Sequence, residues 1–206
     1  MIVACLDLEG VLIPEIWVNV AERAGIEALK LTTRDIPDYD ELMTHRLKVL
    51  DEHGLGMKEI QEVIGTLEPL PGAPEFLQWL TAEGFETIIL SDTFYEFARP
   101  LMPKLGDPTL FCHHLEVNEA GRITAYKLRQ QDQKRHAVNA LKGLNFRCIA
   151  AGDSYNDTSM LGVADAGIFF QPPKNVIEEF PQYPVTQTYQ ELQQQFLAAQ
   201  ANILSS

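Results

Sequence analysis

The sequence predicts an α/β fold, in which a doubly wound, mostly parallel sheet carries a small helical insert after its first strand. Two observations support this prediction. Four short apolar runs recur along the 206 residues, with segments of helical spacing between them, and this alternation is typical of parallel α/β sheets. Residues 14–71 interrupt the alternation, because they contain helical patterns and no strand pattern.

The four apolar runs are predicted to be strands buried on both faces of the sheet. They span residues 2–6, 87–90, 146–151 and 166–170. Short, continuous apolar runs are typical of buried parallel strands. Right-handed crossovers bring the carboxyl ends of such strands to one edge, and three of the runs end there in polar or acidic residues. Because ligands of open α/β sheets bind at this edge, we expect the functional site there.

The segments between and after these strands are predicted to be mainly helical. Apolar residues recur at helical spacing over residues 74–83, 93–105, 133–144 and 156–164. Residues 114–128 are typical of a β-hairpin that turns at Asn118-Glu119-Ala120-Gly121. The Gln-rich tail from Tyr189 is expected to form a helix that packs on the core.

The segment 14–71 is predicted to be a helical insert rather than an ordinary crossover between strands. Its helical patterns cover residues 15–29, 40–53 and 57–67. Pro14 precedes them, and Pro69-Leu70-Pro71-Gly72 follows them. A plain crossover needs only about a dozen residues, far fewer than this. We therefore expect two domains, an α/β catalytic core of residues 1–13 and 72–206 and a helical domain of residues 14–71.

Composition excludes several classes of protein. Acidic residues exceed basic ones, 29 to 16, and the net charge of −13 opposes nucleic acids and anionic membrane surfaces. Cys5, Cys112 and Cys148 are widely spread in apolar stretches, which favours buried thiols over disulfides or a zinc cluster. No apolar run approaches the ~18 residues of a membrane span, and a carboxylate at Asp7 leaves no room for a signal peptide. A soluble, cytoplasmic protein is expected.

The first strand is followed by Asp7-Leu8-Glu9-Gly10-Val11. Alternation along an extended chain sends Asp7 and Glu9 to the same side. Two carboxylates so placed can divide the work, because one can attack or bind a metal while the other holds a proton. Acidic strand ends also occur as helix caps or surface charges, so this segment alone does not decide between the interpretations.

The third strand is followed by Gly152-Asp153-Ser154-Tyr155-Asn156-Asp157. Helix capping is one interpretation, for which Ser154 and Asn156 are also suited. Two acids at one cap exceed what capping requires, and hard oxygen ligands beside a second acidic strand end favour Mg²⁺. Asp153 and Asp7 can meet only if their strands are neighbours in the sheet, which the predicted topology allows.

Two further polar segments suggest a phosphate site. Ser91-Asp92-Thr93 ends the second strand just before a predicted helix, and a hydroxyl with free N–H groups at a helix N-terminus favours phosphate. Lys134 lies near the start of another helix, where a cation opposes the helix dipole. The competing interpretations are an ordinary N-cap at Ser91, a solvated Lys134, and Arg135 in its place.

The order of these segments resembles the haloacid-dehalogenase-type phosphatase superfamily, whose core has a Rossmann-like fold. The motifs span residues 7–157, and residues 14–71 fall where that superfamily inserts its cap. The resemblance implies that Asp7 attacks phosphorus, that Glu9 is the acid and base, and that Ser91, Asp92 and Lys134 line the phosphate site. It also implies a Mg²⁺ site formed by Asp7, Asp153 and the Glu9 backbone carbonyl, with Asp157 in support.

Within the insert, the resemblance extends to phosphoserine phosphatases. Glu15 and Arg46 stand where those enzymes hold the amino acid. Glu15 would pair with an α-ammonium and Arg46 with an α-carboxylate, while Asn156 would also contact substrate. Surface solvation is the competing interpretation for both. The other candidate cations in this segment are Arg23, Arg34 and Lys48.

Two departures define a narrower group. Glu9 replaces the usual second aspartate, and Ser91-Asp92-Thr93 replaces the usual Ser-Gly-Gly. Both match the bifunctional phosphoserine phosphatases that also act as phosphoserine:homoserine phosphotransferases. This resemblance implies phosphoserine as donor, water or homoserine as acceptor, and a role in serine and threonine biosynthesis. Asp92, beside the phosphate, is our candidate for shaping the acceptor.

Other functions share parts of this pattern. A phosphatase for another small phosphomonoester, such as a phosphosugar, would keep the core motifs and differ in the insert. A receiver-like signalling module would accept phosphate on an aspartate without turnover, and a metal-binding structural protein is a third candidate. The oligomeric state is open. His113 and His114 have no assigned role, since adjacent histidines at a hairpin start are more often solvated than ligands.

Overall fold

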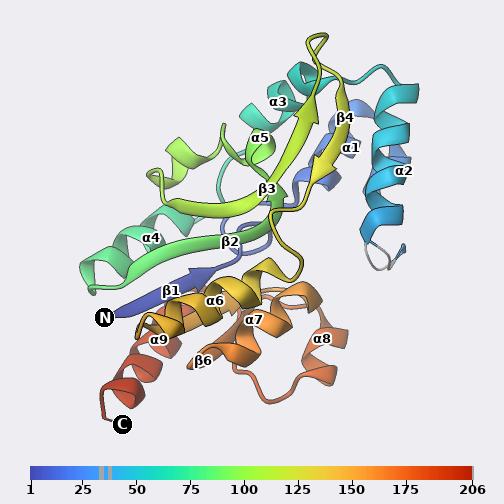
Figure 1. The fold of residues 1–206 in the computed structure, drawn as a ribbon. Coiled ribbons are helices and arrows are strands. Elements are labelled where there is room, and N and C mark those ends of the chain that lie inside the picture. The colour runs from blue at the N-terminus through green and yellow to red at the C-terminus, as the bar shows by residue number, and fades with distance from the viewer. Residues whose placement is uncertain (33–34, 37–38, 206) are drawn as a thin grey trace.

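The computed structural model describes residues 1–32, 35–36 and 39–205 and confirms the doubly wound sheet (Figure 1). The described residues form one sheet in the order β4-β3-β2-β1-β5-β6-β7, parallel except for the antiparallel pair β3–β4. Its strands are β1 Ile2–Leu6, β2 Glu86–Phe94, β3 Thr109–Val117, β4 Ile123–Lys127, β5 Arg147–Gly152, β6 Ala166–Phe170 and β7 Val185–Thr186. All four predicted strands are present.

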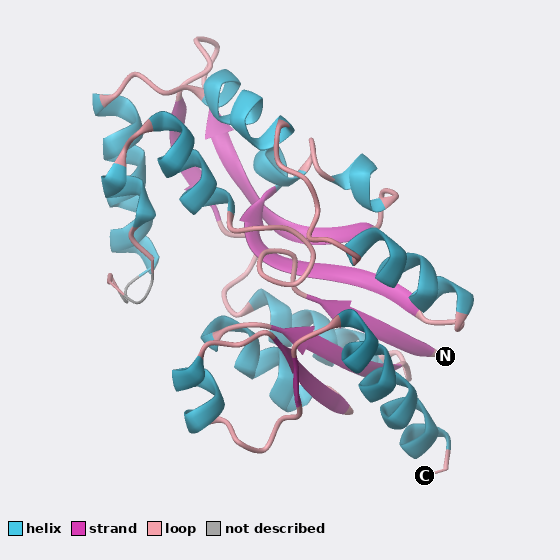
Figure 2. Cartoon of the chain, turned by 180° about the vertical axis from the view of Figure 1, so that it is seen from behind, coloured by secondary structure: helices cyan, strands magenta, loops and turns pink. Residues whose placement is uncertain are grey.

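Helices cover both faces of this sheet (Figure 2). The α-helices are α1 Ile16–Ala24, α2 Tyr39–Glu52, α3 Met57–Gly65, α4 Ala73–Ala82, α5 Tyr95–Ala98, α6 Gln133–Gly143, α7 Thr158–Val163, α8 Lys174–Glu179 and α9 Tyr189–Leu204. The 3₁₀ helices are η1 Glu27–Lys30, η2 Met102–Leu105 and η3 Tyr155–Asp157. The sequence prediction missed α8 and β7.

The long helix predicted over residues 93–105 is wrong. Strand β2 continues to Phe94, and only the short helices α5 and η2 follow it. Pro100 and Pro103 explain the break, because proline lacks the N–H of a helical hydrogen bond and disfavours helical geometry in the preceding residue. The helix predicted over 15–29 is also divided, since Gly25 adopts a left-handed conformation at the end of α1.

The central strand β1 is buried along its whole length, as predicted. Ile2, Ala4 and Leu6 face one apolar cluster, which contains residues of α4 and α9. Val3 and Cys5 face the second cluster, which contains residues of α6, α7 and α8. Successive side chains of a strand point to opposite faces, so this alternation explains why the whole run is apolar.

The predicted hairpin is present as β3 and β4. Gly121 donates its N–H to the Asn118 carbonyl oxygen over 2.9 Å, and Asn118 Oδ1 accepts from the N–H groups of Ala120 and Arg122. The first part of β3 pairs in parallel with β2, so the hairpin extends the main sheet. The three cysteines are buried and free, which confirms their predicted state.

Residues 14–71 supply α1, η1, α2 and α3, and their described residues contain no strand. These helices lie beside the β3–β4 hairpin, beyond the carboxyl end of β1 (Figure 1). Met57 donates its N–H to the Gly121 carbonyl oxygen over 2.8 Å, and Arg122 forms an ion pair with Asp51.

In the described part of the chain, no helix combines the length and apolarity that a membrane span requires.

Candidate active site

Two acidic strand ends meet at the carboxyl edge of the sheet. Strands β1 and β5 are neighbours, with Leu6 opposite Ala151, so the residues that follow them emerge side by side. Carboxylate oxygens of Asp7, Asp153 and Asp157 lie within 4.8 Å of one another. The sequence analysis required β1 and β5 to be neighbours if Asp7 and Asp153 were to approach one another, and the structure confirms this.

Lys134 lies at the centre of this acidic group and is only 1% exposed. Its Nζ lies 2.7 Å from Asp157 Oδ1, 2.8 Å from Asp7 Oδ1 and 3.9 Å from Asp92 Oδ2. Burial alone would lower the pKa of Lys134, but these carboxylates hold it well above its ordinary value, so the amine stays charged. Arg135, the competing cation, is half-buried and pairs with Asp132 instead.

Asp7 is 4% exposed, and burial and the nearby Asp157 carboxylate raise its pKa well above the ordinary value. Its Oδ1 accepts hydrogen bonds from Leu8 N, at 2.7 Å, and from Lys134 Nζ. Within the described residues, the hydrogen bond from Leu8 and the ion pair with Lys134 both involve Oδ1 of Asp7, and no hydrogen bond or ion pair involves Oδ2. Oδ2 is therefore the oxygen that remains open for chemistry.

The acidic group fits a hard divalent cation. Asp157 is fully buried and already committed, since Oδ1 binds Lys134 and Oδ2 accepts from the N–H groups of Asp153 and Ser154 at 2.9 and 3.1 Å. Asp157 therefore supports the loop, while Asp7 and Asp153 present carboxylate oxygens, the donors that Mg²⁺ and Ca²⁺ prefer. Burial, followed by the charges of Asp157 and Glu15, raises the pKa of Asp153 to about 7.

Two glycines permit the close packing of this edge. Gly10 has φ +79°, and a Cβ there would lie 2.5 Å from Asp153 Cγ. A Cβ at Gly152 would lie 2.3 Å from Asp157 Cγ. Both contacts are far inside van der Waals distance, so the two acidic side chains occupy space that only glycine leaves free.

Glu9 lies two residues after Asp7 and contacts the start of the insert. Its Oε2 accepts the N–H of Ile16, the first residue of α1, over 2.8 Å. Burial, and next the negative charge of Glu15, raise the pKa of Glu9 to about 8. At neutral pH this carboxyl group holds a proton that it can donate, as a general acid requires.

Ser91 and Asp92 lie near the end of β2, just before a helix, as predicted. Strand β2 continues through them to Phe94, α5 begins at Tyr95 with Phe94 rather than Ser91 at its N-cap, and the register against β3 is irregular between Leu90 and Phe94. Ser91 is buried, and its Oγ accepts the N–H of Thr93 over 3.3 Å. The irregular stretch of β2 thus carries Asp92 to the acidic group, where its Oδ2 lies 3.9 Å from Lys134 Nζ.

A cavity of about 350 Å³ contains the catalytic candidates together with Glu15 and Arg46. Its other lining residues include Asp7, Glu9, Trp17, Tyr39, Ser91, Asp92, Asp153 and Asn156. Residues from the insert and from the carboxyl edge of the sheet therefore enclose the same space.

Arg46 is the most informative residue of this cavity. It is 8% exposed, its guanidinium carbon lies 4.6 Å from the centre of the Trp17 ring, and Nη2 donates to the Leu31 carbonyl oxygen over 2.9 Å. Burial lowers its pKa. Among the described residues no carboxylate forms an ion pair with Arg46, and its Nε is buried without a partner. A buried guanidinium in this condition is suited to an anionic ligand.

Two of the rival cations of the insert, Arg23 and Lys48, do not line this cavity. Arg23 is exposed in the last turn of α1, and Lys48 is exposed and lies 3.7 Å from Glu52. Arg34 lies outside the described residues.

Sequence reasoning missed Tyr39, Trp17 and His113. His113 was expected to be solvated, but it is 3% exposed, and its Nε2 lies 3.6 Å from Asp92 Oδ1. His114 is exposed, as expected. Adjacent residues of a strand point to opposite faces, so this rule could have shown that one of the two histidines faces inward.

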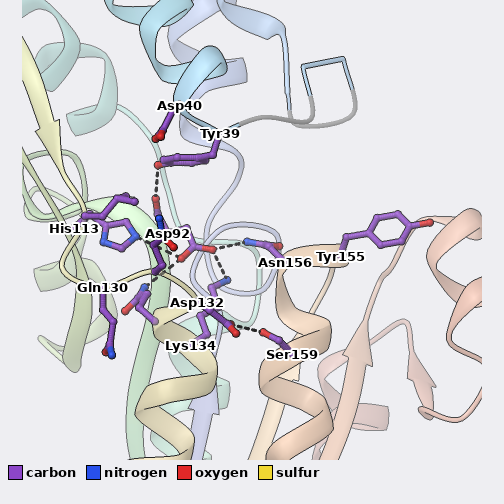
Figure 3. Close-up of a pocket in the computed structure, with 13 residues that line it drawn as sticks. Tyr39, Asp40, Asp92, His113, Gln130, Asp132, Lys134, Tyr155, Asn156 and Ser159 are labelled. Atoms are coloured by element: carbon purple, nitrogen blue, oxygen red, sulfur yellow. Dashed lines mark hydrogen bonds and ion pairs between the residues drawn. The ribbon is translucent and has the colours of Figure 1, made fainter.

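Asp92 also lines a second cavity of about 460 Å³ (Figure 3). Tyr39, Asp92 and Asn156 line both cavities. Asn156 Nδ2 donates to Asp92 Oδ2 over 3.0 Å, and Tyr39 Oη donates to the Asp92 carbonyl oxygen over 3.3 Å. Because they line both, these three residues form a wall between the inner cavity at Asp7 and the outer cavity. Figure 3 shows them from the outer cavity.

The fold and this site define an aspartate-centred hydrolase of the haloacid dehalogenase-like class. Residues 3–165 match the model of the haloacid dehalogenase-like hydrolase family, and the chain belongs to this family. It is therefore an enzyme, which excludes the non-catalytic receiver-like module and the metal-binding structural protein. The helical stretch at 14–71 stands where the family resemblance predicts a cap, while the division into two domains stays a prediction.

The chain is also similar over its whole length to individual proteins. It is 61% identical, over 205 residues and 100% of both chains, to phosphoserine phosphatase ThrH of Pseudomonas aeruginosa. It is 61% identical, over 96% of this chain and 83% of the relative, to a phosphoserine phosphatase of Pseudomonas syringae pv. tomato. Among solved structures, a phospho-aspartyl intermediate analogue of phosphoserine phosphatase has a TM-score of 0.76 at 20% identity, covering 93% of this chain and 97% of that one. The last likeness supports the fold alone.

Proposed function

We propose that this chain is a Mg²⁺-dependent phosphoserine phosphatase that works through an aspartyl phosphate on Asp7 and also transfers the phosphoryl group to homoserine. The observation that carries the proposal is the buried, carboxylate-free guanidinium of Arg46 in one cavity with Asp7 and Glu9. Such a cavity is matched to a phosphomonoester with a carboxylate at its far end. The two relatives at 61% identity, both named phosphoserine phosphatases, support the same substrate.

In the first step, Asp7 Oδ2 attacks phosphorus in line, and the bond between phosphorus and the serine oxygen breaks. Glu9 gives its proton to the departing oxygen, so that serine leaves as a neutral alcohol. In the second step, Glu9 takes a proton from the acceptor, whose oxygen attacks phosphorus and frees the Asp7 carboxylate. Water as acceptor gives phosphate, and homoserine gives phosphohomoserine.

The remaining residues hold charge in place. Lys134 and Ser91 are positioned to bind phosphoryl oxygens, and Asp157 keeps Lys134 fixed. Asp7, Asp153 and the Glu9 backbone carbonyl would hold Mg²⁺, which when bound neutralises charge that develops on the phosphoryl group.

The amino-acid end of the substrate would be held by the insert. Arg46 would bind the α-carboxylate and Glu15 the α-ammonium, with Asn156 at the edge of the pocket. Homoserine is one methylene longer than serine, a difference of only ~0.8 kcal/mol in burial. A pocket that holds the two charged groups can therefore accept either alcohol, and a bound alcohol can compete with water through its effective concentration. The cytoplasmic location is part of this proposal.

The decisive experiment measures phosphate release from phosphoserine with Mg²⁺, with and without homoserine. We expect release to fall as phosphohomoserine appears. Phosphoethanolamine is the matched donor, because it keeps the phosphoester and the ammonium and lacks the carboxylate, so it should be a poor substrate. Equal turnover of both donors would contradict the role of Arg46 and would indicate a phosphatase for another phosphomonoester.

The covalent step needs its own control. Asp7→Asn should abolish both turnover and the acid-stable incorporation of labelled phosphate into the protein. Retained turnover in this variant would overturn the aspartyl-phosphate mechanism.

A further inference from the structure

Asp92 lies between the inner and the outer cavity and is contacted from several elements. Its Oδ2 faces Asn156 Nδ2 at 3.0 Å and Lys134 Nζ at 3.9 Å. Its Oδ1 faces Gln133 Nε2 at 3.4 Å and His113 Nε2 at 3.6 Å. The carboxylate is thus fixed by groups from α6, β3 and η3 (Figure 3).

These contacts keep Asp92 ionised. Burial alone would raise the pKa of Asp92, but the charge of Lys134 and the contacts with His113 and Asn156 hold it below its ordinary value. A charged carboxylate with this many donors has little freedom to rotate. Asp92 is therefore a fixed part of the wall between the two cavities.

The tautomer of His113 follows from its second contact. Arg129 donates its backbone N–H to His113 Nδ1 over 3.0 Å, so Nδ1 carries no proton. The neutral ring then carries its proton on Nε2, which faces Asp92. The same Arg129 donates from Nη2 to Gln133 Oε1 over 2.5 Å and so orients the second group on Asp92 Oδ1. Arg129 therefore contacts both groups that face Asp92 Oδ1, and Gln133 Nε2 also donates to the Ser91 carbonyl oxygen over 2.5 Å.

We propose that His113 is a positioning residue that controls the choice of phosphoryl acceptor by holding Asp92 in the wall between the cavities. The inference rests on the proposed function, because it concerns the second step of that reaction. With Asp92 fixed, water in the outer cavity is kept from phosphorylated Asp7, and an alcohol bound in the inner cavity reacts first. With Asp92 released, the wall opens and hydrolysis gains over transfer.

The test compares two substitutions of one side chain. In His113→Gln the amide N–H₂ lies near the position of Nε2 and still donates to Asp92, whereas in His113→Asn the amide lies near Nδ1 and does not reach it. We expect His113→Asn to lower the ratio of transfer to hydrolysis about tenfold, because the N–H that faces the charged Asp92 carboxylate is lost. His113→Gln should lower it less than about twofold. The exposed neighbour provides the control, and His114→Asn should leave the ratio unchanged.

A double variant tests whether the effect passes through Asp92. In the Asp92→Gly background, His113→Asn should change the ratio no further. The inference is overturned by an equal loss in His113→Asn and His113→Gln, by an undiminished effect in the Asp92→Gly background, or by a wild-type enzyme that transfers to no alcohol.

Two readouts separate this inference from the assignment of phosphoserine. With 4-nitrophenyl phosphate as donor, nitrophenolate reports formation of the phosphoenzyme, and phosphate reports its hydrolysis. Suppose that the enzyme does not turn over phosphoserine, but that His113→Asn still lowers the ratio of transfer to hydrolysis with 4-nitrophenyl phosphate. This result would support the role of His113 and contradict phosphoserine as the substrate. Long-range ¹H–¹⁵N spectra provide the readout that needs no turnover, because they should show the His113 proton on Nε2, and a proton on Nδ1 would overturn the inference.

Discussion

Glu9, which is half-buried, and Arg46, which is buried, are both held in the protonation state that the proposed reaction requires. The raised pKa of Glu9, about 8, follows from burial and from the charge of Glu15, and it keeps the carboxyl protonated at neutral pH. The guanidinium of Arg46 keeps its charge in an environment that penalises it. In each case the fold maintains a costly state beside Asp7, which is more typical of function than of packing.

The leaving group should decide how strongly Glu9→Gln affects the rate. Glutamine cannot supply a proton, so we expect hydrolysis of phosphoserine, whose alkoxide leaves poorly, to slow by roughly 10²–10⁴. 4-Nitrophenyl phosphate releases a stable anion and should slow much less. Single-turnover rates for both donors test this, and an equal loss for both would contradict the role of Glu9 as general acid.

Arg46→Met should separate binding from stability. Methionine removes a buried charge that no carboxylate of the described residues neutralises, so we expect the free energy of unfolding to be unchanged or higher. The KM for phosphoserine should rise about 10- to 100-fold, since the lost charged hydrogen bonds are worth about 1.5–3 kcal/mol. Arg23→Met, on the exposed side of α1, is the control and should leave KM unchanged. Calorimetry and steady-state kinetics measure the two effects.

Residue types and their order predicted which acids converge, but not how each one is used. Asp7 and Asp153 follow short apolar runs, and this alone indicated their approach. The commitment of Asp157 to Lys134 and to two backbone N–H groups depends on a loop geometry that spacing does not reveal. His113 was missed because its partner, Asp92, is adjacent only through the pairing of β2 with β3.

The two loops that carry the acids depend on glycine for their approach to one another. In Gly10→Ala the left-handed φ should cost about 1–2 kcal/mol of unfolding free energy, and the new Cβ must also displace the Asp153 carboxylate. We expect Mg²⁺ affinity to fall at least about tenfold, since Asp153 is a proposed ligand. Titration calorimetry with Mg²⁺ alone measures this.

Gly84→Ala is the matched control for that prediction. Gly84 has φ +80°, like Gly10, but a Cβ there meets no atom within 4 Å. Gly84→Ala should therefore cause the same backbone strain as Gly10→Ala and leave Mg²⁺ affinity unchanged. If both variants lose affinity equally, the close approach of Gly10 to Asp153 has no role in metal binding.

Asp165 links β5 to α6, and its contacts predict a free energy of unfolding that depends on pH. Asp165 Oδ2 accepts the Cys148 N–H over 2.8 Å, and Oδ1 lies 3.2 Å from Arg147 and 3.5 Å from Lys142. Burial alone would raise the pKa of Asp165, but the Cys148 N–H and the two cations lower it. A lowered pKa in the folded state gives a stabilisation that is present at neutral pH and is lost as pH falls through that pKa.

Asp165→Asn should therefore destabilise the protein by about 1 kcal/mol at neutral pH, with the difference from wild type shrinking below the ordinary pKa of aspartate. Urea unfolding at several pH values measures the difference. Glu119→Gln, on the exposed hairpin turn, should show no such trend. A constant difference down to pH 3 would contradict the role of ionised Asp165.

Strands and helices were predicted best where a single sequence pattern covered the segment. The run at 166–170 coincides with β6, because an apolar run bounded by polar residues has few alternatives. The segment 93–105 failed because its helical spacing competes with pairing of β2 to β3, which extends the strand, and with two prolines. Such long-range pairing is invisible to local periodicity.

The insert and the α/β body share one apolar cluster. Met43 and Ile64 of the insert belong to the same cluster as Leu6, Phe97 and the α9 side chains. The insert is also fastened to the hairpin and to η2, where Lys104 Nζ donates to the Leu67 carbonyl oxygen over 2.6 Å. The sequence predicts a separate helical domain from its proline boundaries, and these cross-contacts do not decide whether that domain folds separately.

This continuity predicts that the chain unfolds as one cooperative unit. Met43→Ala in the insert and Phe196→Ala in α9 each remove a fully buried side chain, at a cost of about 2–5 kcal/mol. If the cluster is continuous, both should lower the midpoint of a single calorimetric transition, and hydrogen exchange should report the same loss of protection in both regions. An early separate transition in Met43→Ala, with the α/β body unaffected, would show instead that the insert unfolds alone.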